Sequence, residues 1–273
     1  MITGCSSGIG EACARGLRAR GWRVLATARK SEDVARLAGE GFEALHLDYA
    51  DEASVEAAAE EALSLTQGRL FAVFNNGAYA QPGALEDIET RHLRAQFEAN
   101  FFGWHALTRR LIPAMRAQGA GRIVNCSSVL GLVALRFRGP YIASKFALEG
   151  WADTLRLELR GSGLHIVLIE PGPIRTRFDV NALEAFRRNV DIDASRFAAA
   201  YRGRMARMQR GGATRFQLEP EAVLAKLVHA LEAKRPRARY FVTAPTWIMS
   251  AARRLLPTLA LDTLLASVSD REK

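Results

Sequence analysis

Tyr141 and Lys145, in the stretch GPYIASK at 139–145, are the residues whose types and spacing most directly suggest chemistry. Side chains four residues apart lie on the same face of a helix. An ammonium group beside a phenol lowers the pKa of the phenol, so Tyr141 could donate or accept a proton near neutral pH. The same spacing also occurs in ordinary solvated pairs on helix surfaces, so the residues around the pair must decide between the two interpretations.

A glycine-rich turn occupies the start of the chain, where residues 3–10 read TGCSSGIG. It is followed by a run of helical composition and then by an apolar run that ends at Ala28. Glycines between a strand and a helix let the backbone approach a pyrophosphate, which is held by the N–H groups and the dipole of the helix N-terminus. In this context Gly4, Gly8 and Gly10 predict a dinucleotide site rather than an ordinary tight loop.

Further polar positions recur along the chain: the asparagines at 75–76, Asn100, Ser128 and the Pro-Gly pair at 171–172. Together with the glycine turn and the Tyr141-x-x-x-Lys145 pair, they make residues 1 to 243 resemble the short-chain dehydrogenase/reductase family. The runs at 98–103, 121–128 and 168–176 are similar to its subgroup related to retinol and 17-beta-hydroxysteroid dehydrogenases. The resemblance implies hydride transfer between a nicotinamide cofactor and a carbonyl or alcohol.

The resemblance also implies roles for the catalytic residues. Tyr141 would exchange the proton, Lys145 would stabilise the tyrosinate and bind the nicotinamide ribose, and Ser128 would polarise the carbonyl. Because neighbouring side chains of a strand point to opposite faces, only one of Ser127 and Ser128 can enter the cleft, and the family spacing selects Ser128. Asn100 would hold a water that continues the proton path; the alternative is a core amide that kinks its helix.

The cofactor site implied by the resemblance draws on several strand ends. Asp48 would contact the adenine amine, unless it only forms a surface turn. The order Asn75-Asn76-Gly77-Ala78 exchanges the family's alanine and glycine, so the close backbone approach of glycine shifts by one residue. Besides Tyr141 and Lys145, the implied cofactor-binding residues are Gly4, Ser6, Ser7, Gly8, Ile9, Gly10, Arg29, Asp48, Asn75, Gly77, Ile174 and Thr176.

The end of the second predicted strand indicates which nicotinamide cofactor is used. An acid at this point accepts hydrogen bonds from the ribose hydroxyls of NAD and repels a 2′-phosphate, whereas a cation attracts one. This strand ends in Ala28-Arg29-Lys30. Because the acid is missing and Arg29 offers a planar fork for a phosphate, we predict NADP(H).

Apolar runs alternate with longer helical patterns along the chain. The alternation predicts an α/β fold with a doubly wound parallel sheet of the Rossmann type, in one domain spanning 1–273. Only Met1 and Ile2 precede the glycine turn, which leaves a very short central first strand, so we expect the natural chain to start upstream. The predicted strands are 22–28, 42–47, 70–75, 122–127, 164–169 and 239–243, and the clearest helical stretches are 52–66, 89–118 and 141–160.

Two segments outside the predicted sheet should determine the substrate. Residues 177–212, which contain Phe178, Phe186, Phe197, Tyr201, Met205 and Met208, lie where the family carries its mobile substrate lid. Residues 246–266 predict one or two amphipathic helices, which could cap the pocket, pair subunits or, less favoured, lie on a membrane surface. Few charges converge in these segments, so we expect a small lipophilic substrate, although Arg136 and Arg138 leave an anionic one open.

The composition excludes several other classes of protein. The net charge is +9, but the arginines are scattered over helices rather than gathered in a stripe with aromatics, so nucleic-acid binding is not expected. The three cysteines (Cys5, Cys13 and Cys126) are scattered and odd in number, which favours free thiols in a reducing compartment. The five histidines lack metal-ligand spacing, so we expect no metal. Since no run could span a bilayer or direct secretion, we expect a cytoplasmic protein.

The leading functional prediction is an NADP-dependent oxidoreductase that acts on a lipophilic aldehyde, retinoid, steroid or lipid. One alternative is a ketoreductase of acyl chains on a carrier protein, which would use the basic surface. A non-catalytic Rossmann protein that senses the cofactor is a second alternative, against which the intact Asn100, Ser128, Tyr141 and Lys145 speak. The helices at 89–118 and 141–160 resemble the family's pairing faces, which implies a homodimer or homotetramer.

Overall fold

The computed structural model describes residues 1–210 and 216–270, with the side chains of 207–210 left aside. The strands in this part of the chain are β1 (Leu25–Ala28), β2 (Glu43–His46), β3 (Ala72–Asn75), β4 (Gly121–Cys126), β5 (Leu164–Glu170) and β6 (Arg239–Phe241). The α-helices are α1 (Gly8–Ala19), α2 (Ser31–Gly39), α3 (Glu52–Leu65), α4 (Thr90–Phe97), α5 (Gly103–Gln118), α6 (Gly139–Glu158), α7 (Phe178–Asn189), α8 (Ala198–Arg210), α9 (Glu221–Glu232), α10 (Ala244–Leu255) and α11 (Thr258–Asp270). Short helical turns are η1 (Leu85–Asp87), η2 (Glu98–Phe102) and η3 (Val129–Gly131).

All strands pair in parallel: β1 with β2, and β3 to β6 in chain order. Ile2 joins the two halves, because it bridges Ala26 on one side and Phe74 on the other. The Ile2 N–H donates to the Leu25 carbonyl at 2.8 Å, and the Ile2 carbonyl accepts from the Thr27 N–H at 2.9 Å. The expected central strand is therefore present, reduced to a single bridging residue.

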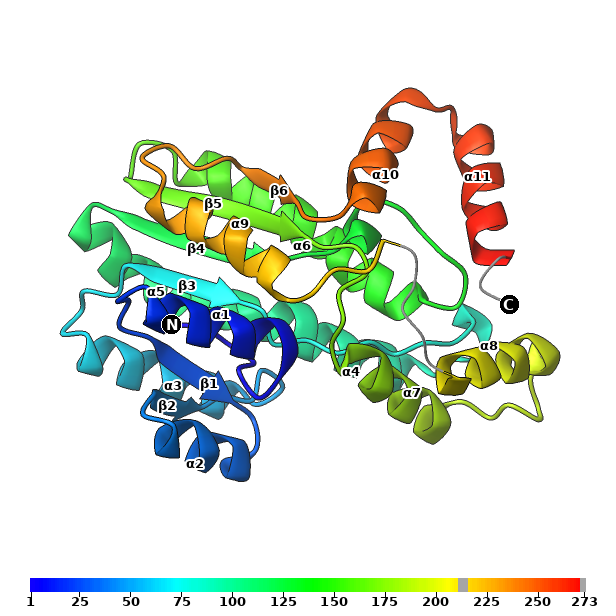
Figure 1. Cartoon of the computed structure of the whole chain (residues 1–273), viewed down its shortest axis with the longest axis horizontal. Helices are drawn as coiled ribbons and strands as arrows, with labels where there is room; N and C mark the ends of the chain where they lie inside the picture. Colours follow the sequence, from blue (N-terminus) through cyan, green and yellow to red (C-terminus); the bar gives the residue numbers. More distant parts are fainter. Residues whose placement is uncertain (211–215, 271–273) are drawn as a thin grey trace.

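Helices cover both faces of this sheet, with α1 and α9 in front of it and α5 and α6 behind it in Figure 1. The helices also pack on one another in pairs, α1 on α9 and α3 on α5. Apolar side chains from both layers are buried in the core with those of the strands, among them Leu17 of α1, Leu227 of α9 and Leu107 of α5. The predicted doubly wound Rossmann fold is confirmed.

The helical stretch predicted at 89–118 is present from Thr90 to Gln118, but it is not a regular α-helix throughout. It consists of α4, the π-helical turn η2 and α5, and Asn100 lies in the turn. The side chain of Asn100 is bonded to the backbone of Tyr79, and a Cβ on Gly103 would lie 2.3 Å from the Tyr49 carbonyl oxygen. These two contacts require a local shift in the helix that hydrophobic periodicity does not reveal.

The C-terminal stretch predicted at 246–266 forms two helices, α10 and α11. Figure 1 shows them as a hairpin that rises from the β6 end of the sheet. The predicted lid at 177–212 contains α7 and α8, and its residues 211–212 lie outside the described part of the chain.

Candidate active site

The predicted site residues gather at the carboxyl edge of the parallel sheet. Ser128 follows β4, Gly77 follows β3, and Pro171 follows β5. The glycine turn enters α1 at this same edge, beside Ile2. Ligands of open α/β sheets bind outside the carboxyl ends of the strands, so the topology alone brings together residues that are far apart in sequence.

Tyr141 and Lys145 are not a solvated pair. Both lie on α6 and are buried, with 8% and 1% of their surface exposed. The Lys145 Nζ donates a hydrogen bond of 2.8 Å to the Cys126 carbonyl at the end of β4. It also lies 4.3 Å from the centre of the Trp104 ring and 5.6 Å from that of Tyr141. The lysine is therefore fixed between the sheet and the phenol.

Burial dominates the acid–base behaviour of this pair. Desolvation lowers the pKa of Lys145 to about 8, although the neighbouring Cys126 and Glu149 oppose that shift. The same desolvation raises the pKa of Tyr141, although a hydrogen bond from Ser128 and the charge of Arg138 act to lower it. The lowered phenol pKa expected from the Tyr–Lys spacing is thus not found, because desolvation outweighs the nearby charges.

The buried lysine makes the stability of the protein depend on pH. Since its pKa is about 8 when folded and 10.5 unfolded, the unfolded state binds more protons between these values, and this group's contribution to stability rises with pH. Between pH 7 and pH 10.5, we expect the free energy of unfolding of wild type to rise by up to about 3 kcal/mol more than that of Lys145→Met. Urea unfolding across this range measures the difference.

Comparing the two proteins at each pH cancels the buried tyrosines and cysteines, which titrate in the same range. Lys30→Met removes an exposed lysine instead. Its free energy of unfolding should differ from that of wild type by the same amount at each pH. A constant difference between wild type and Lys145→Met would show that Lys145 titrates normally in the folded protein.

The two adjacent serines point in different directions, as strand alternation requires. The Ser127 hydroxyl donates a short hydrogen bond to the Glu149 carboxylate, on the side away from Tyr141. Ser128 accepts a hydrogen bond of 3.1 Å from the Leu130 N–H, and it lies close enough to Tyr141 to act against the rise in the pKa of the phenol. The structure therefore places Ser128, rather than Ser127, next to Tyr141.

Asn100 is fully buried and held at both ends of its amide. It accepts from the Tyr79 N–H at 3.2 Å and donates to the Tyr79 carbonyl at 2.9 Å. Its Nδ2 also lies 3.5 Å from the hydroxyl of Ser144, which neighbours Lys145 on α6. The side chain therefore ties the π-helical turn to the loop after β3.

The glycine turn owes its shape to contacts that leave no room for a side chain. Gly4 and Gly8 have φ of +69° and +60°, in the left-handed region that favours glycine. A Cβ on Gly10 would lie 2.1 Å from the Gly4 carbonyl oxygen, and one on Gly4 would lie 2.6 Å from the Gly77 Cα. Gly77 thus supplies the close approach in the exchanged Asn-Asn-Gly-Ala order. The Thr176 side chain lies opposite Gly8, and a Cβ on Gly8 would lie 3.0 Å from it.

The first turn of α1 presents backbone donors at this edge. Ser7 is the N-cap residue, but its hydroxyl makes no capping bond to the helix. The N–H groups of Gly8, Ile9 and Gly10 belong to the first turn, which has no intrahelical acceptors. Ser6 keeps the turn in place, because its carbonyl accepts a 2.9 Å hydrogen bond from Arg36. This is the arrangement that binds a phosphate at a helix N-terminus.

The remaining predicted cofactor residues are Arg29, Asp48, Ile174 and Thr176. Arg29 is exposed at the end of β1, and Asp48 is half-buried and accepts a hydrogen bond of 3.0 Å from the Ala50 N–H. Ile174 packs on the main core. Thr176 accepts a hydrogen bond of 3.2 Å from the Phe178 N–H, where the lid begins.

Asn75 lies beneath the site rather than in it. Its side chain is fully buried, accepts from the Tyr49 hydroxyl at 2.9 Å, and donates to Thr108 and Asn125 at 3.1 and 2.9 Å. Both amide hydrogens and one acceptor position of Asn75 are used by the protein, so its side chain supports the end of β3.

Sequence reasoning missed a buried group of charges behind Lys145. Glu149, one helical turn after Lys145, pairs with Arg239 on β6, which also binds Glu170 at 2.7 Å and Asp153 at 2.8 Å. Desolvation raises the pKa values of both glutamates. The spacing of Lys145, Glu149 and Asp153 along one helix face could have revealed part of this group.

The lid lies over Tyr141 as an apolar cover. The Phe178 ring meets the Tyr141 ring edge-on, with centroids 5.4 Å apart. Tyr141 also belongs to a buried apolar cluster with Ala80, Leu130, Ile142 and Ala182. The surroundings of the phenol are thus apolar on the side away from Lys145.

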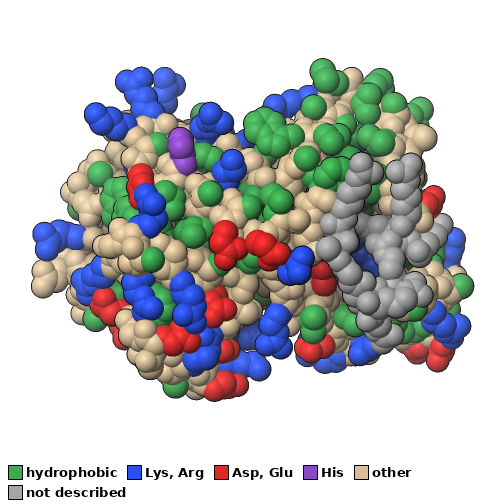
Figure 2. All heavy atoms as spheres, viewed as in Figure 1, with side chains coloured by type: hydrophobic (Ala, Val, Ile, Leu, Met, Phe, Trp, Pro, Cys, Tyr) green, Lys and Arg blue, Asp and Glu red, His purple; other side chains and the backbone are tan. Residues whose placement is uncertain are grey.

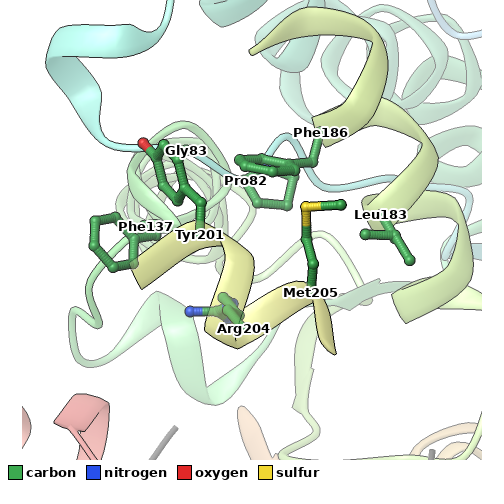
Figure 3. A pocket seen from close by; sticks show the side chains of 8 residues that line it. All are labelled: Pro82, Gly83, Phe137, Leu183, Phe186, Tyr201, Arg204 and Met205. Carbon is green, nitrogen blue, oxygen red and sulfur yellow. The ribbon is translucent and has the colours of Figure 1, made fainter. Parts of the chain in front are cut away.

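A pocket of about 290 Å³, including its part open to solvent, lies under the lid rather than at the Tyr141 hydroxyl. Figure 3 shows side chains from α7 and α8 facing Pro82 and Phe137 across it. Its lining is formed by Pro82, Gly83, Phe137, Leu183, Phe186, Tyr201, Arg204 and Met205. Met208, also expected in the lid, lies outside the residues whose side chains are described.

Hydrogen bonds fasten α8 to the loop beneath it. The hydroxyl of the buried Tyr201 accepts from the Ala84 N–H at 2.7 Å and donates to the Asp87 carboxylate at 2.5 Å. Ser195 donates to the same carboxylate at 2.6 Å. These contacts fix the lid in the position seen here.

The C-terminal hairpin holds the loop between Ser128 and Tyr141. Arg253 on α10 donates to the Leu132 carbonyl, and Arg136 pairs with Asp270 on α11 at 2.8 Å. Arg136, considered for an anionic substrate, is thereby engaged in a structural ion pair. In the described part of the chain, no group of His, Cys, Asp and Glu side chains could hold a metal ion, and no helix is long and apolar enough to cross a membrane.

Comparison with known proteins extends these observations. The family model described as short chain dehydrogenase matches residues 1–185. The sequence is 44% identical to the uncharacterized oxidoreductase YbbO of Escherichia coli, over 97% of this chain and 93% of YbbO. It is 33% identical to an NADPH-dependent 3-dehydrocapnine reductase of Ornithobacterium rhinotracheale, over 96% and 94% of the two chains. Human retinol dehydrogenase 16 is 32% identical, over 98% of this chain and 88% of its own.

The fold comparison leads to the same group. A short-chain dehydrogenase from Streptomyces avermitilis superposes with a TM-score of 0.78 at 28% identity, covering 99% of this chain and 94% of that one. Because the family model matches most of the chain and relatives align along nearly its whole length, the chain belongs to the short-chain dehydrogenase/reductase family of oxidoreductases, with retinol dehydrogenases among its relatives.

Proposed function

We propose that the protein transfers hydride between NADP(H) and a lipophilic carbonyl or alcohol. The observation that carries this proposal is the position of Tyr141. Its phenol lies next to Ser128, its ring centre is 5.6 Å from the Lys145 Nζ, and it is packed among apolar side chains. A polar reaction centre inside an apolar enclosure suits a substrate whose only polar group is the one that reacts.

The residues at the sheet edge fit a dinucleotide. Side chains are excluded where Gly4, Gly10 and Gly77 meet, and the first-turn N–H groups of α1 are available to a pyrophosphate. The exposed Arg29 would receive the 2′-phosphate of NADP, and Ala28 before it carries no charge that would repel it. Asp48, Ile174 and Thr176 would contact the adenine and carboxamide ends. The similar 3-dehydrocapnine reductase is named as NADPH-dependent.

The nicotinamide, when bound, supplies or accepts the hydride. In reduction, Ser128 donates a hydrogen bond to the substrate oxygen, and Tyr141 gives it a proton as negative charge develops there. Lys145 stabilises the tyrosinate that remains, and Asn100 keeps the π-helical turn and α6 in position for a water that replaces the proton. Oxidation follows the same steps in reverse.

The Arg29→Ala variant tests the cofactor choice. We expect its affinity for NADPH to fall about tenfold, because a charge-assisted phosphate contact is lost, while its affinity for NADH stays unchanged. Lys30→Ala is the matched control, since Lys30 is the exposed cation next in the chain. Titration of both cofactors by fluorescence gives the affinities. Equal losses for both cofactors in Arg29→Ala would remove Arg29 from phosphate recognition.

A panel of aldehydes of increasing chain length, followed through NADPH absorbance, tests the activity. We expect kcat/KM to rise with chain length, because each added methylene is buried in an apolar enclosure. Cofactor binding without any turnover would favour the alternative of a cofactor-sensing protein. Turnover that requires a carrier-linked acyl chain would favour the ketoreductase, which the basic composition supports.

We also propose that the protein acts in the cytoplasm as a homodimer or homotetramer paired through α5 and α6. The three cysteines are buried and free, as expected in a reducing compartment. Exposed apolar side chains lie near the proposed pairing surface, including Phe102 before α5 and Leu157 on α6. Light scattering during gel filtration measures the assembly.

A further inference from the structure

Helix α10 carries its polar residues inward and its apolar residues outward. Thr246 and Ser250 are buried, at 0% and 5% exposed. On the opposite face Trp247, Ile248 and Leu255 are 55%, 54% and 79% exposed. A helix that packs on a globular protein normally buries its apolar stripe, so this orientation leaves an apolar face without a cover in the described chain.

The apolar face continues around the turn between α10 and α11. Leu256 and Leu259 are 38% and 81% exposed, and every residue from Arg253 to Ala260 is exposed. Figure 2 shows hydrophobic side chains gathered where Figure 1 places the two helices. We call Trp247, Ile248, Leu255, Leu256 and Leu259 the hairpin face.

The charges beside the hairpin face are of one sign. From Ala244 to Leu261 the chain contains no Asp or Glu, whereas Arg253 and Arg254 stand at the end of α10. Arg253 is engaged with the Leu132 carbonyl and the Phe146 ring. Arg254 is exposed. It lies on the same side of the helix as Trp247, which is seven residues earlier, so its charge is available to a partner that binds the apolar face.

We propose that the hairpin face is a docking surface for lipid membranes with anionic headgroups. Trp, Ile and Leu on one face with Arg at its edge is the composition of helices that lie in a membrane interface. A second copy of the chain fits less well, because a two-fold contact would bring two Arg254 side chains together while this segment offers no carboxylate. Anionic headgroups supply the missing counter-charge, and the exposed turn can enter a soft interface.

The hairpin face is connected to the catalytic edge of the sheet. Helix α10 packs on η3, which follows Ser128 directly, and α11 holds Arg136 through Asp270. A membrane at the hairpin face would therefore lie beside the loop that separates Ser128 from Tyr141. If the proposed function holds, docking brings the opening of the site to a lipophilic substrate, but docking itself does not depend on turnover.

Co-sedimentation of the full chain with lipid vesicles tests the proposal. One set of vesicles is phosphatidylcholine alone, and the other contains about one third phosphatidylglycerol. We expect wild type to bind the mixed vesicles at least about fivefold more tightly. Leu255→Ser with Leu259→Ser should weaken this binding by about tenfold or more, and Arg254→Gln by about fivefold. Leu65→Ser, at the exposed leucine that ends α3, should bind as wild type does.

Folding and assembly are checked in the same proteins. The substituted leucines are exposed, so the melting temperature should stay unchanged. Absence of wild-type binding to the mixed vesicles, or equal binding by all variants, would overturn the proposal. So would light scattering that shows a dimer which the leucine substitutions dissociate, because the hairpin face would then pair two copies. None of these measurements uses turnover, so the proposed function can fail independently.

Discussion

Tyr141→Phe should lose nearly all turnover while keeping its fold and its cofactor. General acid–base catalysis by a positioned side chain contributes about 10²- to 10⁴-fold, and we expect kcat to fall within that range. Only the hydroxyl is removed, so the edge contact with Phe178 and the packing in the apolar cluster remain. Stopped-flow measurement of NADPH consumption at saturating substrate gives the rate.

Tyr240→Phe is the matched control for this loss. Tyr240 is also buried, but its hydroxyl bonds His229 at 2.7 Å and accepts from the Arg237 N–H, away from the catalytic residues. It should lose stability and keep its rate. If Tyr141→Phe turned over within tenfold of wild type, with NADPH still bound, another group would have to supply the proton.

The position of the catalytic pair could be predicted from the sequence because the information is local. Tyr141 and Lys145 are one helical turn apart, and Ser128 follows a strand whose apolar run is easy to recognise. The positions of Gly4, Gly8 and Gly10 could also be predicted from local information, because the turn lies directly before a helix and a strand in the sequence. The parallel, doubly wound arrangement of the sheet followed from the alternation of strands and helices.

The electrostatics of the pair could not be predicted in the same way. The spacing of Tyr141 and Lys145 indicates attraction between a charge and a phenol, but the sign of the net shift depends on burial by distant segments. Trp104, Phe178 and Leu130 approach the pair from α5, the lid and η3. None of these contacts follows from local spacing, so the desolvation that raises the phenol pKa became visible only in the folded structure.

Non-local contacts also explain the other differences from the sequence-based predictions. The family resemblance implies that Asn75 contacts the cofactor, whereas in the structure its side chain bonds buried partners from three other segments. The ion pairs of Arg239 join β6 to α6. The outward apolar face of α10 was recognised as amphipathic, but only packing shows which side faces the protein. Periodicity identifies a face, and tertiary structure decides where it points.

Gly10→Ala should damage both the fold and the cofactor site. Its φ is not in the left-handed region, so the cost arises from the 2.1 Å between the new Cβ and the Gly4 carbonyl oxygen. Backbone must move to relieve this overlap, and overpacking of this kind costs about 1–3 kcal/mol of stability. The movement separates the turn from α1, so we expect NADPH affinity to fall about 10- to 100-fold.

Gly150→Ala makes the same chemical change where space is free. Gly150 is exposed in α6, and a Cβ there would have no neighbour within 4 Å. Alanine should stabilise that helix by about 0.5–1 kcal/mol and leave cofactor affinity unchanged. Urea unfolding and NADPH titration of both variants therefore separate the general effect of replacing glycine from the specific contact between Gly10 and Gly4. Full NADPH affinity in Gly10→Ala would mean that the turn tolerates displacement, and that the first-turn N–H groups of α1 are not what holds the pyrophosphate.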